Sequence, residues 1–135
     1  MLTKYEPIMK TKSFFLLLGV LGLVACKDAS DLQSFIPGTY VDYAKGEYSE
    51  SWDTLIIGDF NKVKGSYPII RKTGFRRFDN GKPGRLEYEV ERWLGIWDKE
   101  SESIQVPRNS KIISFYPDSG VLLLGAREYR KLGAE

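Results

Sequence analysis

Three glutamates at alternate positions have the spacing best suited to chemistry. Glu87, Glu89 and Glu91 fall on one face of an extended segment, because successive strand side chains point to opposite faces. Two carboxyl groups held close together can act as acid and base in glycoside cleavage. The alternate positions are apolar or aromatic and suit the core-facing side of a strand: Leu86, Tyr88 and Val90.

A hairpin across residues 79–84, whose loop contains the strong turn signal Asn-Gly, gives the glutamates a simpler role. In one register Arg76 faces the first glutamate and Lys72 faces Glu91. In a tighter register Lys72 faces Glu89 instead. Exposed cross-strand pairs of opposite charge stabilise a sheet modestly. We therefore interpret the glutamates as a solvated, salt-bridged face and not as a catalytic pair.

The composition excludes several kinds of catalysis. The chain has no histidine and one cysteine. Histidine is the usual general base near neutral pH and the commonest metal ligand. Ser-His-Asp catalysis, Cys-His catalysis and Cys/His zinc sites are therefore excluded. We expect no catalytic activity, no metal and no cofactor.

The distribution of charge argues against a nucleic-acid partner. The formal net charge is +2, and it comes from the first 26 residues, where Lys4, Lys10 and Lys12 outnumber Glu6. The remainder of the chain is neutral. Nucleic-acid binding depends on basic groups that neutralise phosphates, so a neutral domain offers no general attraction.

The N-terminal segment has the pattern of a secretory signal. Lys10 and Lys12 precede an apolar run over residues 14–25. As a helix this run spans only about 18 Å, which is too short for a bilayer core of about 30 Å. A positive start and a short apolar run fit a signal peptide over residues 1–25. Translation starts at Met1 or at Met9.

The four residues that end this run, Leu23, Val24, Ala25 and Cys26, resemble the lipobox of bacterial lipoproteins. The resemblance implies that the Cys26 thiol receives a diacylglyceryl group, that the leader is cut before it, and that the new amine is acylated. It also implies a lipid anchor in the cell envelope, with the outer membrane favoured over the inner one. A plain signal peptide or a membrane anchor is the alternative. We interpret residues 26–36 as the lipidated N-terminus and tether.

Residues 37–135 contain short runs rich in aromatic and β-branched residues, separated by turn residues. Helical periodicity does not persist beyond the signal. We predict an all-β domain of seven to eight antiparallel strands, either a small up-and-down β-barrel or a sandwich, preceded by the signal helix. The expected strands are residues 38–45, 51–60, 66–78, 85–98, 103–106, 110–118 and 120–132.

The two ends of this domain resemble the lipocalin-like β-barrel families of small secreted bacterial proteins. In those families a glycine and an aromatic residue in the first strand pack beneath a cation from the last strand. Gly38 and Tyr40 match the first two positions, and Arg127, or Arg130 as the less favoured choice, matches the cation. The resemblance implies an up-and-down barrel.

Aromatic residues are the candidate binding residues. After Arg92 both faces of the strand become apolar, which indicates a bulge near Gly95 or a covered surface. The same residues suit a strand core, and that reading stays open. The candidate contacts for a ligand or partner are Trp93, Trp97, Tyr40, Tyr43, Tyr48 and Trp52.

These observations together predict a lipid-anchored lipoprotein of the cell envelope. Its β domain is expected to bind a protein, a glycan or a small apolar ligand without catalysis. A structural or accessory role in an envelope complex is one alternative. A carboxylate-based envelope hydrolase is the other.

Overall fold

The structure is a computed structural model that describes residues 29–133. The signal, the lipobox and Cys26 lie outside the described residues. The chain divides into two compact units, residues 1–31 and Leu32–Glu135, and the barrel belongs to the second. Among residues 29–133, no helix has the length and apolar character needed to cross a bilayer.

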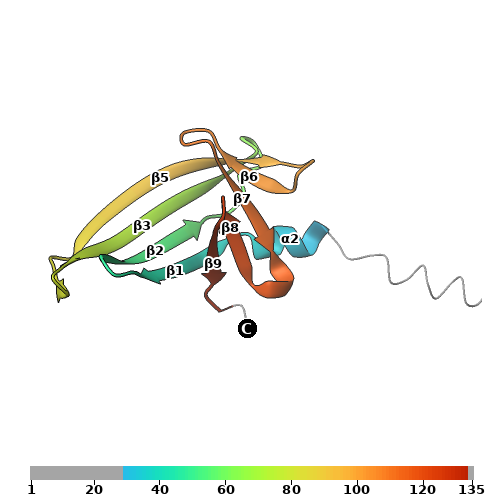
Figure 1. Cartoon of the computed structure of the whole chain (residues 1–135). Coiled ribbons are helices and arrows are strands. Elements are labelled where there is room, and N and C mark those ends of the chain that lie inside the picture. The colour runs from blue at the N-terminus through green and yellow to red at the C-terminus, as the bar shows by residue number, and fades with distance from the viewer. Residues whose placement is uncertain (1–28, 134–135) are drawn as a thin grey trace, which may run out of the picture. The chain divides into compact units, whose positions relative to one another are not determined.

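The described part of the chain is almost entirely strand. Figure 1 shows one short helix followed by strands that run up and down in chain order. The elements are α2 (Ala29–Phe35), β1 (Gly38–Lys45), β2 (Ser49–Ile57), β3 (Ser66–Asp79), β4 (Lys82–Pro83), β5 (Glu87–Asp98), β6 (Ser103–Val106), β7 (Lys111–Tyr116), the 3₁₀ turn η1 (Pro117–Ser119), β8 (Val121–Leu124) and β9 (Arg127–Lys131).

The strands close into an antiparallel barrel. Each strand pairs with the next in the order β1, β2, β3, β5, β6, β7, β8, β9, and β9 returns to pair with β1 at Tyr40↔Lys131 and Val41↔Arg130. The short β4 pairs only with β3. The expected run 120–132 is two strands, because Gly125 adopts a φ of 61° and turns the chain between β8 and β9. The prediction of an all-β barrel is confirmed, with closure in place of a sandwich.

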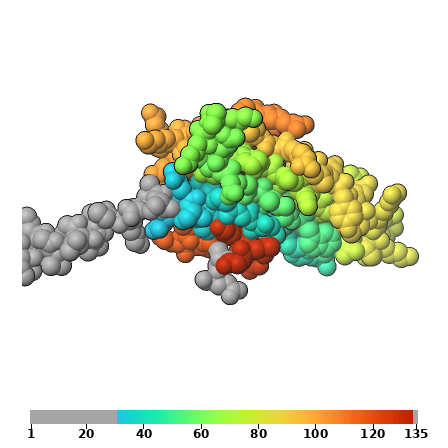
Figure 2. Space-filling model, turned by 180° about the vertical axis from the view of Figure 1, so that it is seen from behind, coloured from blue at the N-terminus to red at the C-terminus, as the bar shows by residue number. Residues whose placement is uncertain are grey.

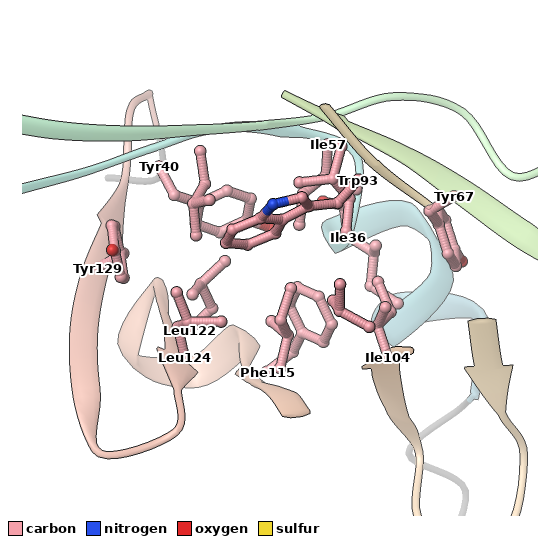
Figure 3. Close-up of a cluster of buried hydrophobic side chains, with 14 residues drawn as sticks. Ile36, Tyr40, Ile57, Tyr67, Trp93, Ile104, Phe115, Leu122, Leu124 and Tyr129 are labelled. Carbon is pink, nitrogen blue, oxygen red and sulfur yellow. The ribbon is translucent and has the colours of Figure 1, made fainter. Parts of the chain in front are cut away.

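Alternate side chains of the eight strands fill the barrel with an apolar core, in which Figure 3 shows Tyr40, Trp93, Phe115 and Leu122 pointing toward one another. Ile36 after α2 is fully buried, and Leu32 and Phe35 pack partly buried against this core. The core members are Ile36, Tyr40, Leu55, Ile57, Tyr67, Ile69, Trp93, Ile104, Val106, Ile113, Phe115, Leu122, Leu124 and Tyr129.

Helix α2 differs from the expectation of a tether over residues 26–36. The sequence offered no helical periodicity there, yet residues 29–35 are helical. Packing against the barrel core stabilises this short helix, because the barrel partly buries its apolar side chains. The Tyr40 hydroxyl lies 2.9 Å from the carbonyl oxygens of both Phe35 and Ile36 and donates to the end of the helix.

The cation that covers the ring of Tyr40 is Lys131 and not an arginine. Its ammonium lies 5.8 Å from the Tyr40 ring and 4.4 Å from the Phe35 ring, and it donates to the Phe35 carbonyl. Gly38 has a φ of 151°, a conformation that other residues rarely adopt, so glycine is favoured here. The expectation for Arg127 is wrong, because Lys131 is the β9 residue opposite Tyr40 in the register. Arg127 lies over the ring of Tyr129 instead.

Four strands are longer than the other four. Strands β1, β2, β3 and β5 have 8, 9, 14 and 12 residues, whereas β6 to β9 have 4 to 6. The long strands therefore continue past the closed ring as a curved sheet (Figure 1). Figure 2 shows the hairpin ends of this sheet, in teal and yellow, at the opposite end of the domain from α2, in blue.

The hairpin between β3 and β5 contains an extra residue that changes its register. Its tip is the tight Asn-Gly turn, with Asn80 and Gly81 at φ values of 48° and 76° and Asp79 opposite Lys82. The main ladder then pairs Phe75 with Glu87, one residue out of step with the tip. The tighter of the two registers considered from the sequence is therefore right at the tip, and both are wrong along the main ladder.

Gly84 accommodates this shift. Its N–H donates to the Arg77 carbonyl at 2.7 Å, and a Cβ at this position would lie 2.7 Å from the same oxygen. A one-residue shift moves every following side chain to the other face of the sheet. The loop thus determines which face of β5 points into the barrel.

The two faces of β5 are the reverse of the expectation. Trp93 is 5% exposed and Gly95 is buried on the inner face, which the glutamates share. Tyr88 and Val90 are 73% and 60% exposed on the outer face. The bulge expected near Gly95 is absent from the β3–β5 ladder, which runs unbroken to Ile96. Glycine is required at position 95 because a Cβ would lie 2.3 Å from Cγ2 of Ile104.

Candidate functional site

A buried carboxylate organises the inner face beyond the apolar core. The Asp53 side chain has 0% exposure and accepts hydrogen bonds from Arg71 at 2.7 Å and from the Tyr129 hydroxyl at 2.8 Å. A second guanidinium, that of Arg127, lies 3.1 Å from the same Asp53 oxygen and also donates to Asp42 at 2.5 Å. Residues from β2, β3 and β9 therefore meet at one carboxyl group, and Arg127 links this group to Asp42 of β1.

The environment of Asp53 keeps it ionised. Burial by itself would raise the pKa of Asp53, but hydrogen bonds from Arg71 and Tyr129 and the charges of Arg71 and Arg127 outweigh burial and hold that pKa below its usual value. Burial raises the pKa of the Tyr129 phenol, so it stays a neutral donor. A carboxylate held in this way is suited to joining strands and not to exchanging protons.

The glutamate row lies near this cluster but does not form a catalytic pair. Glu87 and Glu89 are exposed, and Glu91 is half-buried with a carboxyl oxygen 3.7 Å from Arg71. The glutamates face solvent on the inner side, because the long strands extend past the core that would otherwise cover them. Within residues 29–133, no cluster of three or more acidic, cysteine or histidine side chains is placed to hold a metal.

The outer face carries an aromatic row across four strands. Tyr43 of β1 lies opposite Trp52 of β2, Trp52 lies opposite Gly74 of β3, and Gly74 lies opposite Tyr88 of β5. A Cβ on Gly74 would lie 3.3 Å from the Tyr88 ring and 3.9 Å from the Trp52 ring. The two rings therefore flank and cover the glycine. We call Tyr43, Trp52 and Tyr88 the outer row.

A hydrogen-bonded group fixes one end of the outer row. The Tyr43 hydroxyl donates to Glu50 at 2.5 Å, and Nε of Arg76 donates to the other Glu50 oxygen at 2.8 Å. These two bonds lower the pKa of Glu50. The Arg76 guanidinium lies 5.3 Å from the Trp52 ring, and the Tyr43 and Trp52 rings are 5.7 Å apart. The contacts with Tyr43 and Arg76 therefore hold the Trp52 ring in one orientation in the free protein.

Two shallow grooves lie on either side of Trp52. One, of about 520 Å³, runs over β1, β2, β8 and β9 and is lined in part by Tyr43. The other, of about 650 Å³, runs over β2, β3 and β5, and its lining includes Leu86, Tyr88 and Val90. Trp52 lines both grooves. An indole between two hollows is a suitable contact for a flat or extended partner.

The structure separates the six candidate aromatic residues into three groups. Tyr43, Tyr48 and Trp52 are 53%, 74% and 36% exposed. Tyr40 and Trp93 are buried in the core. Trp97 is half-buried and packs edge-on against Tyr67, with ring centroids 6.2 Å apart.

Sequence reasoning missed three residues of the outer surface, Leu86, Tyr88 and Val90. It placed them in the core because they alternate with glutamates. The signal that could have found them is Gly84, a glycine placed where the hairpin must accommodate one extra residue.

The fold and the outer row define a class of protein: a small closed antiparallel β-barrel with its interior filled and aromatic side chains on its outside. No protein-family model, curated protein or solved structure matches the chain. The resemblances to bacterial lipoproteins and to lipocalin-like barrels therefore depend on the residues quoted for them above.

Proposed function

We propose that this protein is a lipid-anchored component of the bacterial cell envelope whose barrel acts by binding and not by catalysis. The observation that carries the binding role is the outer row, which places three aromatic side chains across four strands beside two grooves. The lipobox residues ending at Cys26 support the anchor. The partner contacts the outside of the barrel.

The interior is a poor site for a ligand. Fourteen apolar side chains occupy the barrel where a lipocalin-like pocket would open (Figure 3). Small barrels commonly fill in this way. Beyond this core, the ion pairs of Asp53 occupy the inner face. Both oxygens of the Asp53 carboxylate already accept hydrogen bonds from arginine or tyrosine side chains, so neither is free for a ligand.

The arrangement of carboxyl groups favours binding over hydrolysis. Asp42, Glu50 and Asp53 are each paired with an arginine. Glu87 and Glu89 are exposed on a strand and lack the apolar, water-excluded surroundings of a general acid. An accessory role in an envelope complex would use the same outer surface, so it is a form of the same proposal.

The anchor is tested by Cys26→Ala in the full-length chain. We expect this variant to lose both fatty-acid label and membrane fractionation, because no thiol remains to form the thioether bond and a stable anchor needs the acyl chains. Metabolic labelling and ultracentrifugation measure the two effects. Trp52→Ala is the control and should keep both. Unchanged partitioning of Cys26→Ala would refute the anchor.

The binding surface is tested by Tyr88→Ala against Tyr116→Ala. Both tyrosines are exposed, at 73% and 47%, but Tyr116 belongs to β7, away from the outer row. In pull-downs from solubilised envelopes with the full-length chain, we expect Tyr88→Ala to recover about tenfold less of the bound partner, whether that partner is a protein or an anionic lipid. Tyr116→Ala should behave as wild type. If the two variants behave alike, the outer row is not the contact.

A further inference from the structure

The outer face of the long strands is apolar well beyond the outer row. Along β5, Leu94 and Ile96 are 50% and 37% exposed on the same face as Tyr88 and Val90. Leu86, just before the strand, is 38% exposed. Monomeric soluble domains rarely expose a continuous apolar surface across several strands without a use for it. We call this surface, with the outer row, the outer patch.

Basic residues predominate on the outer patch. Those on the outer face of β1, β3 and β5 are Lys45, Lys72, Arg76 and Arg92. The acids on the outer face of these strands and β2 are Glu50, which is 6% exposed and held by Arg76, and Asp98 at the end of β5, which is bonded to Ser101 and Gln105. Within the described residues, neither Lys72 nor Arg92 has an ion pair. The unpaired side chains of Lys72 and Arg92 therefore give the patch a positive charge that a partner surface can neutralise.

The inner face of the same sheet carries charges of both signs. Its acids on β1, β2 and β5 lie beside Arg71 and Arg77 of β3, and Arg71 pairs with Asp53 and Glu91. Among the described residues, the two faces therefore differ in their unpaired groups, which are cations on the outer face and, besides Arg77, the exposed glutamates of β5 on the inner face. The inner-face acids are Asp42, Asp53, Glu87, Glu89 and Glu91.

We propose that the outer patch lies against an anionic lipid surface. Tryptophan and tyrosine concentrate at the level of lipid headgroups, where an apolar ring and a polar edge are both accommodated. Basic residues next to them are attracted to anionic headgroups. Apolar side chains of the patch, such as Leu86 and Val90, enter the boundary with the acyl chains.

The charges disfavour the other occupants. A second copy related by a two-fold axis would place this patch against an identical one, so the unpaired cations Lys72 and Arg92 would face a surface that carries the same unpaired cations. A neutral glycan would leave both cations unpaired and Val90 without an apolar contact. An anionic bilayer satisfies the apolar and the basic parts of the patch together.

This inference rests on the proposed anchor for its location. The six peptide units from Cys26 to Leu32 reach at most about 20 Å, so an acylated Cys26 keeps the barrel beside a bilayer. Docking of the outer patch then needs only weak affinity, because the tether raises its local concentration.

The test places a single thiol on each face of β5 in the full-length lipidated chain. Val90→Cys puts the thiol on the outer patch, and Glu87→Cys, also exposed, puts it on the inner face. Each variant is labelled with an environment-sensitive fluorophore and reconstituted in vesicles containing phosphatidylglycerol or in vesicles of phosphatidylcholine alone. Iodide quenching measures exposure of the label. Mass spectrometry confirms one label per chain, which shows that Cys26 is blocked.

We expect the label at position 90 to be shielded in phosphatidylglycerol vesicles and exposed in phosphatidylcholine, while the label at position 87 is exposed in both. Lys72→Glu with Arg92→Glu should reduce the docked fraction by more than about tenfold, at about fivefold for each charge. Lys62→Glu with Lys99→Glu, both exposed and away from the patch, is the control with the same change of charge.

Three results would overturn the proposal. Equal quenching at positions 87 and 90 would show that the patch does not dock. Shielding that depends on protein concentration in detergent would assign the patch to a second copy. Shielding that requires added envelope protein would assign it to a protein partner. A failed anchor is distinguishable from all three, because it gives two labels per chain and no retention by vesicles.

Discussion

Asp53→Ala destabilises the barrel by about 3–5 kcal/mol, the loss expected when one partner of a buried ion pair is removed. The variant leaves the guanidinium groups of Arg71 and Arg127 without the carboxylate that they share, and it removes the acceptor of the Tyr129 hydroxyl. Urea unfolding followed by tryptophan fluorescence measures the change in the free energy of unfolding.

Asp42→Ala is the matched control for this variant. Asp42 lies opposite Asp53 on the neighbouring strand, but its side chain is 23% exposed and pairs with Arg127 alone. Its removal should cost clearly less, because the remaining guanidinium keeps Asp53 as a partner. Equal losses for the two variants, or no loss for Asp53→Ala, would contradict the central role of Asp53.

The effect of Asp53 should also depend on pH. Because its pKa is held below the usual value in the folded state, Asp53 contributes stability that is complete above the unfolded pKa of about 4. That contribution is lost as the pH falls toward the folded pKa. The difference in unfolding free energy between wild type and Asp53→Ala should therefore shrink below about pH 4.

Trp93→Ala is expected to be destabilising by about 3–5 kcal/mol, as for other large aromatic side chains deleted from a core. Trp93 is 5% exposed, and its ring lies 5.6 Å from the Arg71 guanidinium and 5.9 Å from the Lys111 ammonium. The variant would create a cavity and leave these cations without the ring. Thermal and urea unfolding measure the loss.

Trp52→Ala separates the two roles that tryptophan has in this protein. Trp52 is 36% exposed, so its removal should cost about 1 kcal/mol or less in stability while weakening partner binding. If Trp93→Ala left stability unchanged and Trp52→Ala lowered it strongly, the assignment of Trp93 to the core would be wrong.

The strand boundaries were predictable because turn chemistry is local. The Asn80-Gly81 turn and the left-handed Gly120 lie where the sequence placed turns. Six of the expected runs correspond to strands within a few residues at each end. Closure into a barrel was one of two possibilities, since the pairing of β1 with β9 joins segments from opposite ends of the domain.

The assignment of faces could not be predicted from alternation alone. Leu86, Tyr88 and Val90 alternate with glutamates, and alternation shows that two faces differ without showing which one is buried. The decision depends on Gly84, where one extra residue shifts the ladder. The outer patch was missed for this reason.

The Asp53 cluster was invisible to the sequence for a different reason. Asp53 bonds to Arg71 and Tyr129, which are 18 and 76 residues away along the chain. No spacing rule relates residues that only barrel closure brings together. Arg127 was singled out, but as a cover for Tyr40 and not as a partner of Asp42.

The barrel closes where β9 pairs with β1, and this junction has fewer backbone pairs than the junction between β3 and β5. Ten residue pairs join β3 to β5, but two join β9 to β1. The inward side chains of β9 provide the rest: Arg127 reaches Asp42 of β1, Tyr129 reaches Asp53 of β2, and Lys131 reaches the end of α2. The seam between β9 and β1 therefore depends on polar side chains more than the β3–β5 pairing does. We expect acid to weaken this seam first, because protonation of Asp53 removes the charge that attracts Arg127. Opening there would release the C-terminal hairpin while the four long strands stay together.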